Sequence, residues 1–156
     1  MDETELKAAH EELLALFAET FAVTARAFDK LASFDERECA QWMGYQSTTH
    51  YLNFCAGISM VTAREHVRVA RALVSLPLVK AAFARGAISY SKVRAVTRIA
   101  NADNEEALLN IANSATAAQV DRLVRGCQRV TADDAKKQSR ARSAEYGFDA
   151  AGMFYL

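Results

Sequence analysis

Hydrophobic residues recur at every third or fourth position through most of the chain, and this spacing is typical of one face of an α-helix. The first such stretch, residues 3–38, carries acids in its first turns, where the helix dipole favours negative charge. Its apolar stripe consists of Leu6, Leu13, Leu14, Phe17, Phe21, Thr24, Phe28 and Leu31. So long a stripe requires a partner, either the chain's own later helices or the same helix of a second copy. In a homodimer we expect Phe17, Phe21 and Phe28 at the interface.

Glycine, serine and proline divide the middle of the chain into four further helices. Gly57 and Gly86 suit the left-handed conformation that ends a helix. Ser59 and Ser89 suit N-caps, and Pro77 suits a first helical turn. The expected helices are residues 48–56, 60–75, 77–85 and 90–100. The first two, spanning about 48–75, fit the helix-turn-helix pattern, in which the second helix enters the DNA major groove.

The second helix of this pair carries three arginines on one side. Arg64, Arg68 and Arg71 fall together at helical spacing, and the arginine fork suits phosphate because it bonds two oxygens at once. The alternative is a solvated face with local ion pairs. We expect Arg64, near the helix N-terminus, to read bases, and the other two to contact the DNA backbone. Residues of the helix 90–100 complete the predicted DNA-binding set, namely Lys92, Arg94 and Arg98.

Two sequence patterns predict the last helices. Asp103 with Glu106 and Thr116 with Gln119 have capping-box spacing, so supporting helices should extend over residues 77–138. The run EYGFDAAGMFYL then alternates apolar and polar residues and predicts the start of a β-hairpin. The expected architecture is an all-α domain of residues 1–142, followed by the start of a truncated C-terminal segment, residues 143–156. Between the first two helices, the bend Glu38–Gln46 carries Trp42 and Tyr45. We expect this aromatic cluster to plug the core, and the alternative is a platform on which bases stack.

Composition narrows the functional classes. The chain has 156 residues and a formal net charge of zero, so it is one domain rather than a polybasic DNA-coating protein, and any nucleic-acid site is a local patch. Three widely spaced cysteines predict reduced, half-buried thiols and a cytoplasmic protein. No apolar run approaches the ~18 residues of a membrane span.

Enzyme chemistry is not expected for this chain. His10, His50 and His66 lack metal-ligand spacing with the cysteines, and no glycine-rich phosphate loop is present. We therefore predict no metal, no small-molecule cofactor and no catalytic residue, with His66 in the core. Two functions remain. Double-stranded DNA is the expected partner if the six cations merge into one exposed patch. A dimerisation or protein-interaction module is expected if the phenylalanines are exposed instead.

Three segments resemble a known actinobacterial family. They are GISMVTAREHVRVARALVSLP, AFARGAISYSKVRAVTRIA and NEEALLNIANSATAAQVDRLVRGCQRV, and they resemble domain of unknown function 222, also called the 13E12 repeat family. The resemblance covers roughly residues 5–156. Members often carry an HNH endonuclease domain after this region, so the resemblance implies a targeting or accessory role beside a nuclease. No histidine follows His66, so no residue of an HNH motif is carried over.

A second resemblance concerns the central stretch. The order Gly57-x-Ser59, Leu76-Pro77 and Ile88-Ser89 is similar to the DNA-binding region of ParB-type partition proteins, in which a helix-turn-helix precedes a Leu-Pro step. The sequence departs from that pattern at Asn53 and His66. These two residues weaken the expectation that a helix enters the DNA groove more than they weaken the expected order of the helices.

Overall fold

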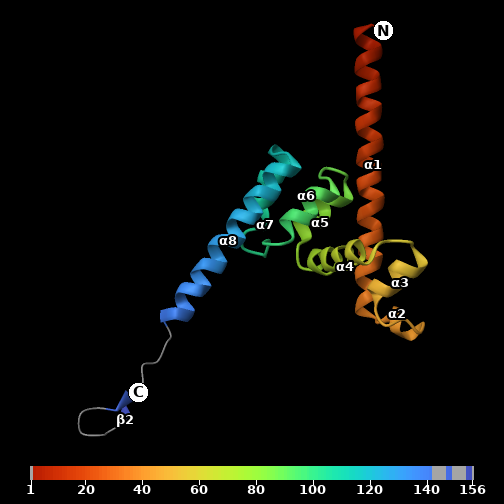
Figure 1. Ribbon diagram of the computed structural model, residues 1–156. Coiled ribbons are helices and arrows are strands. Elements are labelled where there is room, and N and C mark those ends of the chain that lie inside the picture. Colours follow the sequence, from red (N-terminus) through yellow and green to blue (C-terminus); the bar gives the residue numbers. More distant parts are fainter. Residues whose placement is uncertain (1, 142–146, 149–153, 156) are drawn as a thin grey trace. The chain divides into compact units, whose positions relative to one another are not determined.

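The computed structural model describes residues 2–141, 147–148 and 154–155. Eight helices lie in these residues (Figure 1): α1 (Glu3–Glu36), α2 (Cys39–Trp42), α3 (Thr48–Cys55), α4 (Met60–Val74), α5 (Pro77–Ala84), α6 (Tyr90–Val96), α7 (Glu105–Ser114) and α8 (Ala117–Ala141). The all-α prediction is confirmed. The chain divides within α8 into two compact units, Met1–Val124 and Arg125–Leu156. The predicted domain boundary at residue 142 stays a prediction.

The second unit contains two short strands after α8. β1 (Gly147–Phe148) pairs antiparallel with β2 (Phe154–Tyr155), with Gly147 opposite Tyr155 and Phe148 opposite Phe154. This pairing agrees with the predicted start of a hairpin. The expected turn residues, 149–152, lie outside the described residues.

Local sequence signals set most helix boundaries. The hydroxyls of Ser59 and Ser89 accept hydrogen bonds from the backbone N–H three residues later, at 3.2 and 3.4 Å. Gly57 and Gly86 have φ of 64° and 71°, and Pro77 is the first residue of α5. The predicted caps and helix ends are therefore confirmed at these positions.

The predicted capping box of Asp103 and Glu106 is wrong. The helix begins at Glu105, one residue after Asn104. Asn101 and Asn104 bond to each other's backbone, with Asn101 N donating to Asn104 Oδ1 at 2.7 Å and Asn104 N donating to Asn101 Oδ1 at 3.1 Å. Asparagine side chains compete for local backbone groups in this way and favour turns. They displace the helix start by forming the turn themselves.

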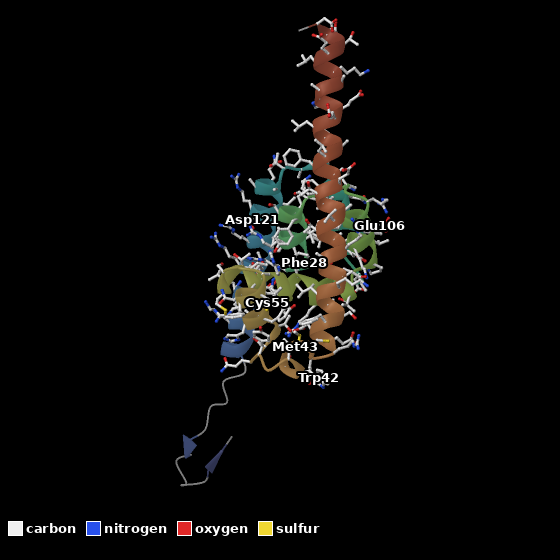
Figure 2. The ribbon with its side chains drawn as sticks, turned by 90° about the vertical axis from the view of Figure 1, so that its right-hand side faces the viewer. Phe28, Trp42, Met43, Cys55, Glu106 and Asp121 are labelled. Carbon is white, nitrogen blue, oxygen red and sulfur yellow. The ribbon has the colours of Figure 1, made fainter. Side chains whose placement is uncertain are left out.

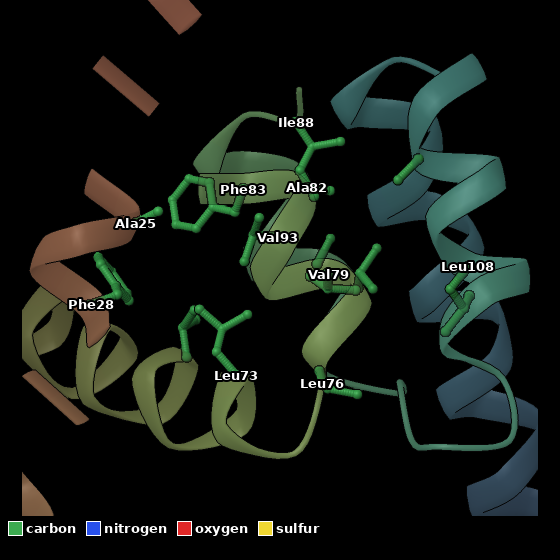
Figure 3. Packing of buried hydrophobic residues seen from close by; sticks show 14 of the residues in the cluster. Ala25, Phe28, Leu73, Leu76, Val79, Ala82, Phe83, Ile88, Val93 and Leu108 are labelled. Carbon is green, nitrogen blue, oxygen red and sulfur yellow. The ribbon is translucent and has the colours of Figure 1, made fainter. Parts of the chain in front are cut away.

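The core of the first unit lies between α1, α4, α5, α6, α7 and the first turns of α8. Figure 3 shows Phe28 of α1 and Phe83 of α5 facing the space next to Leu73 of α4. The turn between α5 and α6 lies against α1, because a Cβ added at Gly86 would come within 2.9 Å of Ala18 Cα. Ala18 therefore marks where the body of the unit begins along α1.

Two aromatic predictions need correction. Phe28 is only 4% exposed and packs against His66 and Tyr90, with ring centroids 5.1 and 5.2 Å apart, so it is not available as a dimer contact. Trp42 is 92% exposed rather than buried, as Figure 2 shows at the end of the one-turn helix α2. That helix turns Ala40 inward instead, and its single turn leaves Trp42 on the outer side.

The predicted burial of His66 and of the three cysteines is confirmed for some of these residues and wrong for others. The prediction that His66 lies in the core agrees with its ring contacts, and burial lowers the pKa of His66. All three cysteines are free, but only Cys39 is half-buried, whereas Cys55 and Cys127 are exposed. The half-buried prediction is therefore wrong for the last two.

Candidate interaction surfaces

Glu65 organises the largest cluster of predicted DNA-binding residues. Its carboxylate accepts hydrogen bonds from Arg68 Nε at 3.0 Å, from Arg68 Nη2 at 2.9 Å and from Arg98 Nη2 at 2.9 Å. These bonds lower the pKa of Glu65 from 4.5 to about 2. The hydrogen bond from the Arg68 guanidinium is the largest cause, and Arg98 adds to it. Two of the six predicted cations are thus neutralised in part by one carboxylate that is charged at neutral pH.

Arg68 also ties α4 to the end of α6. Its Nη1 donates to the Thr97 carbonyl at 3.2 Å, and its Nη2 donates to the Arg94 carbonyl at 3.0 Å. These carbonyls lie at the C-terminal end of α6, where the helix dipole favours a cation. The guanidinium therefore bridges two helices and has few donors left for a ligand.

Two more predicted DNA contacts also have partners within the chain. Arg71 donates from Nε and Nη2 to the two oxygens of Asp35 on α1, at 2.6 and 3.2 Å. This paired geometry raises the pKa of Arg71 and lowers the pKa of Asp35. Lys92 Nζ donates to the Ala112 carbonyl at 2.6 Å, which links α6 to α7.

Arg64 and Arg94 differ from the other four cations. Both are exposed, and among the described residues neither side chain has a hydrogen bond or ion pair. Arg94 lines a shallow pocket of about 240 Å³ together with Tyr90 and Arg98, next to the N-terminal turn of α4. The predicted patch of six thus contains two cations that are unpaired within the described part of the chain.

The N-terminal part of α1 is a second candidate surface. Every residue from 3 to 17 is exposed, and this segment, called the arm below, extends past the other helices of the first unit (Figures 1 and 2). Five large hydrophobic side chains of the arm are each between 52% and 57% exposed, namely Leu6, Leu13, Leu14, Leu16 and Phe17. Of the predicted interface residues, Phe17 belongs to the arm, and Phe21 is half-buried where the body begins.

The arm is also acidic. Residues 2–17 contain five acids and one lysine, and that lysine, Lys7, lies 3.9 Å from Glu11. Asp2 and Glu5 form a reciprocal capping box that fixes the first turn. The arm is thus a well-started helix with an apolar stripe and acidic flanks.

One buried glutamate was not anticipated from the sequence. Glu105 is 3% exposed, and its Oε1 accepts a hydrogen bond from the backbone N–H of Val79 at 2.8 Å. Val79 is the third residue of α5, so the α7 carboxylate caps another helix across 26 positions of sequence. No local pattern connects residues so far apart, so the sequence analysis did not single out Glu105.

Other classes of site are not found in the described part of the chain. No group of three or more His, Cys, Asp and Glu side chains there could hold a metal ion. No helix among those residues is long and apolar enough to cross a membrane.

Comparison with known proteins gives one match. A family model described as "Domain of unknown function (DUF222)" matches residues 7–150. Neither the curated proteins nor the solved structures contain a match.

Proposed function

Because the chain belongs to the DUF222 family, whose description assigns no activity, we propose its function from its own surface. The chain is a protein-interaction module that self-associates through the arm of α1. The observation that supports this proposal is the exposure of five large hydrophobic side chains on a helical segment that no other part of the first unit covers.

Helix physics supports a docked arm. Isolated helices shorter than about 12–15 residues are marginal in water, and most helices in proteins are stabilised by packing of their apolar face. The arm has the length of such a marginal helix and no packing partner in its own unit. Burying its side chains against a partner would contribute roughly 25 cal/mol per Å² of apolar surface removed from water. Contiguous exposed apolar patches are typical of interaction sites.

Sedimentation velocity at micromolar concentration tests this proposal. The native chain, of 17.1 kDa, should sediment with twice that mass, and the double variant Leu13→Gln/Leu16→Gln should sediment as a monomer. Glutamine has a helix propensity close to that of leucine, so the arm should keep its helix. Leu78→Gln is the matched control, because Leu78 is an exposed leucine of α5 outside the arm, and it should not change the mass. A native chain that remains monomeric to high micromolar concentration contradicts the proposal.

DNA binding is the second candidate function, and the exposure of Arg64 and Arg94 favours it. These two side chains lie on helices that Arg68 holds together, so both could approach one duplex. In this function the module would act beside an HNH nuclease in related chains. Arg71, Lys92 and Arg98 would first have to release their partners within the chain, so we expect them to contribute less than the sequence suggested.

Duplex binding at several salt concentrations tests the second candidate. Each phosphate contact contributes about 0.9 to the slope of log affinity against log salt. Arg64→Ala and Arg94→Ala should each flatten that slope by about one unit, whereas Arg85→Ala, which removes an exposed arginine at the end of α5, should not. If Arg64 reads a base, its removal should instead relax the preference for one base pair. Absence of salt-dependent binding at low salt rejects this candidate.

A further inference from the structure

Helix α1 carries a second apolar row that the core does not use. Counting Leu6 as position a of a seven-residue repeat, the a positions are Leu6, Leu13, Thr20 and Ala27, and the d positions are Ala9, Leu16 and Val23. All seven side chains are exposed. The residues that face the body, such as Ala18, Phe21, Ala25 and Phe28, fall instead at positions b and f. The helix therefore has one apolar stripe toward its own core and an exposed seam on another side.

We propose that this seam forms a parallel two-stranded coiled coil with α1 of a second copy. The proposal rests on the self-association proposed above and specifies its seam, partner and orientation. Hydrophobic a and d positions sustained for about three heptads are typical of coiled coils. Residues 6–27 provide that length, roughly 33 Å of helix. The seam extends beyond the arm to Val23, which is 53% exposed, so the paired segment is longer than the arm itself.

The flanking charges select the parallel orientation. The g positions are Glu5, Glu12, Glu19 and Arg26, and the e positions are His10, Phe17, Thr24 and Leu31. In a parallel pair each g residue faces the e residue five positions later on the partner helix. Glu12 then lies beside Phe17 and Glu19 beside Thr24, so no two acids meet across the seam.

The antiparallel alternative brings like charges together. In an antiparallel pair, g positions face g positions. Alignment of the seam on its middle places Glu12 opposite Glu19 near the centre, once on each side, and Glu5 opposite Arg26 toward the two ends. The acid pairs near the centre disfavour that arrangement. The Glu5–Arg26 pairs offset them only in part, because Glu5 lies in the first turn of α1, where helices fray and exposed ion pairs contribute little. A foreign helix with its own heptads would also fit the seam, but a second copy supplies a seam of the same length and register and, in parallel orientation, places no acid opposite an acid.

Reversible disulfide formation distinguishes the orientations. In a background in which Cys39, Cys55 and Cys127 are replaced by serine, A9C and T20C each place one thiol on the exposed seam. In a parallel pair, the same residue of each copy faces its counterpart. In a glutathione redox buffer, most molecules of each variant should therefore form a disulfide-linked homodimer. A mixture of A9C and a size-tagged T20C should give little cross-link between the two variants. Circular dichroism should show that both variants keep the helix content of the native chain.

The outcomes distinguish failure of the parallel coiled coil from failure of the proposed self-association. In the antiparallel pair Ala9 faces Thr20, so a cross-link predominantly between A9C and T20C would overturn the parallel seam while leaving self-association intact. A native dimer whose variants form no cross-link would place the interface elsewhere and would also overturn the seam. A native chain that is monomeric in sedimentation rejects the proposed function itself. A cross-link of each variant only with itself, in a chain that sediments as a dimer, supports both.

Discussion

Replacement of Glu65 by glutamine should destabilise the first unit measurably. The carboxylate accepts three hydrogen bonds from two arginines, Arg68 of α4 and Arg98 just beyond α6. Glutamine keeps the size of the side chain but removes its charge and one acceptor oxygen. The two guanidinium groups would then repel each other without a counter-charge between them. Arg68 would keep its bonds to the Thr97 and Arg94 carbonyls, so we expect the helices to stay packed.

The pKa of Glu65 sets the size of the effect. A carboxyl whose pKa falls from 4.5 to about 2 gains about 3 kcal/mol in its charged form, at 1.36 kcal/mol per pKa unit. Water reaches this cluster, since the Arg98 side chain is 36% exposed, and solvent screening reduces such energies. We therefore expect Glu65→Gln to lower the free energy of unfolding by about 1–2 kcal/mol at pH 7.

The pH dependence has a defined sign. Because the pKa of Glu65 is lower in the folded chain than its ordinary value, the stabilisation is complete above about pH 4.5 and is lost as the pH falls toward 2. The native chain and the variant should thus differ in stability at pH 7 and converge near pH 2. Asp29 and Asp35 also have lowered pKa values, but they are present in both proteins and cancel in the difference.

Urea denaturation followed by circular dichroism at pH 7, 4 and 2.5 measures this difference. Glu106→Gln is the matched control, because Glu106 is an exposed glutamate of α7 that has no partner among the described residues, and it should change stability by less than about 0.5 kcal/mol. Equal effects of the two substitutions at pH 7, or an effect of Glu65→Gln that persists unchanged at pH 2.5, would refute the reasoning. The same variant removes the negative charge beside Arg68 and Arg98, so any binding to a DNA duplex should increase.

Two further predictions concern the packing of the helices. Gly86→Ala should cost about 3 kcal/mol of stability in urea denaturation, because Gly86 has a positive φ and an added Cβ would meet the backbone of Ala18. The control, Gly57→Ala, has a similar φ but open space around it, so it should cost only about 1–2 kcal/mol. Equal costs would contradict the contact between Gly86 and Ala18. Glu105→Ala should cost about 1–3 kcal/mol by leaving the buried N–H of Val79 without an acceptor. Glu105→Gln keeps an acceptor oxygen and should cost clearly less in the same measurement.

Local signals in the sequence predicted the helices well. Each confirmed boundary depends on residues within three or four positions of each other, such as Ser59 with the N–H of Thr62, or Thr116 with Gln119. Such bonds form within one segment of chain and leave a pattern in its sequence. Asn101 and Asn104 show where such patterns fail. Their side chains bond the backbone groups of the turn, so the predicted capping box of Asp103 and Glu106 does not form.

The surfaces were harder to predict, because periodicity identifies a face and not its neighbour. Phe17 and Phe28 belong to one predicted stripe, yet one is exposed and the other buried. The difference arises because the turn at Gly86 first meets α1 at Ala18. In the same way, helical spacing grouped Arg68 with Arg71 but did not reveal that Arg71 would bond Asp35, 36 positions away.

If the two proposed functions hold, the two candidate surfaces should respond to salt in opposite directions, so that a salt series on one protein separates self-association from DNA binding. The arm is apolar with acidic flanks, so salt screens repulsion between two arms and strengthens apolar association. The surface with Arg64 and Arg94 is cationic, so salt weakens its attraction for phosphate. A parallel pair would also place both copies of this surface at the same end of the paired α1 helices, where one duplex could engage both and gain affinity from bivalency. Self-association would then raise DNA affinity only within a window of intermediate salt, in which the arms are paired and phosphate attraction still persists.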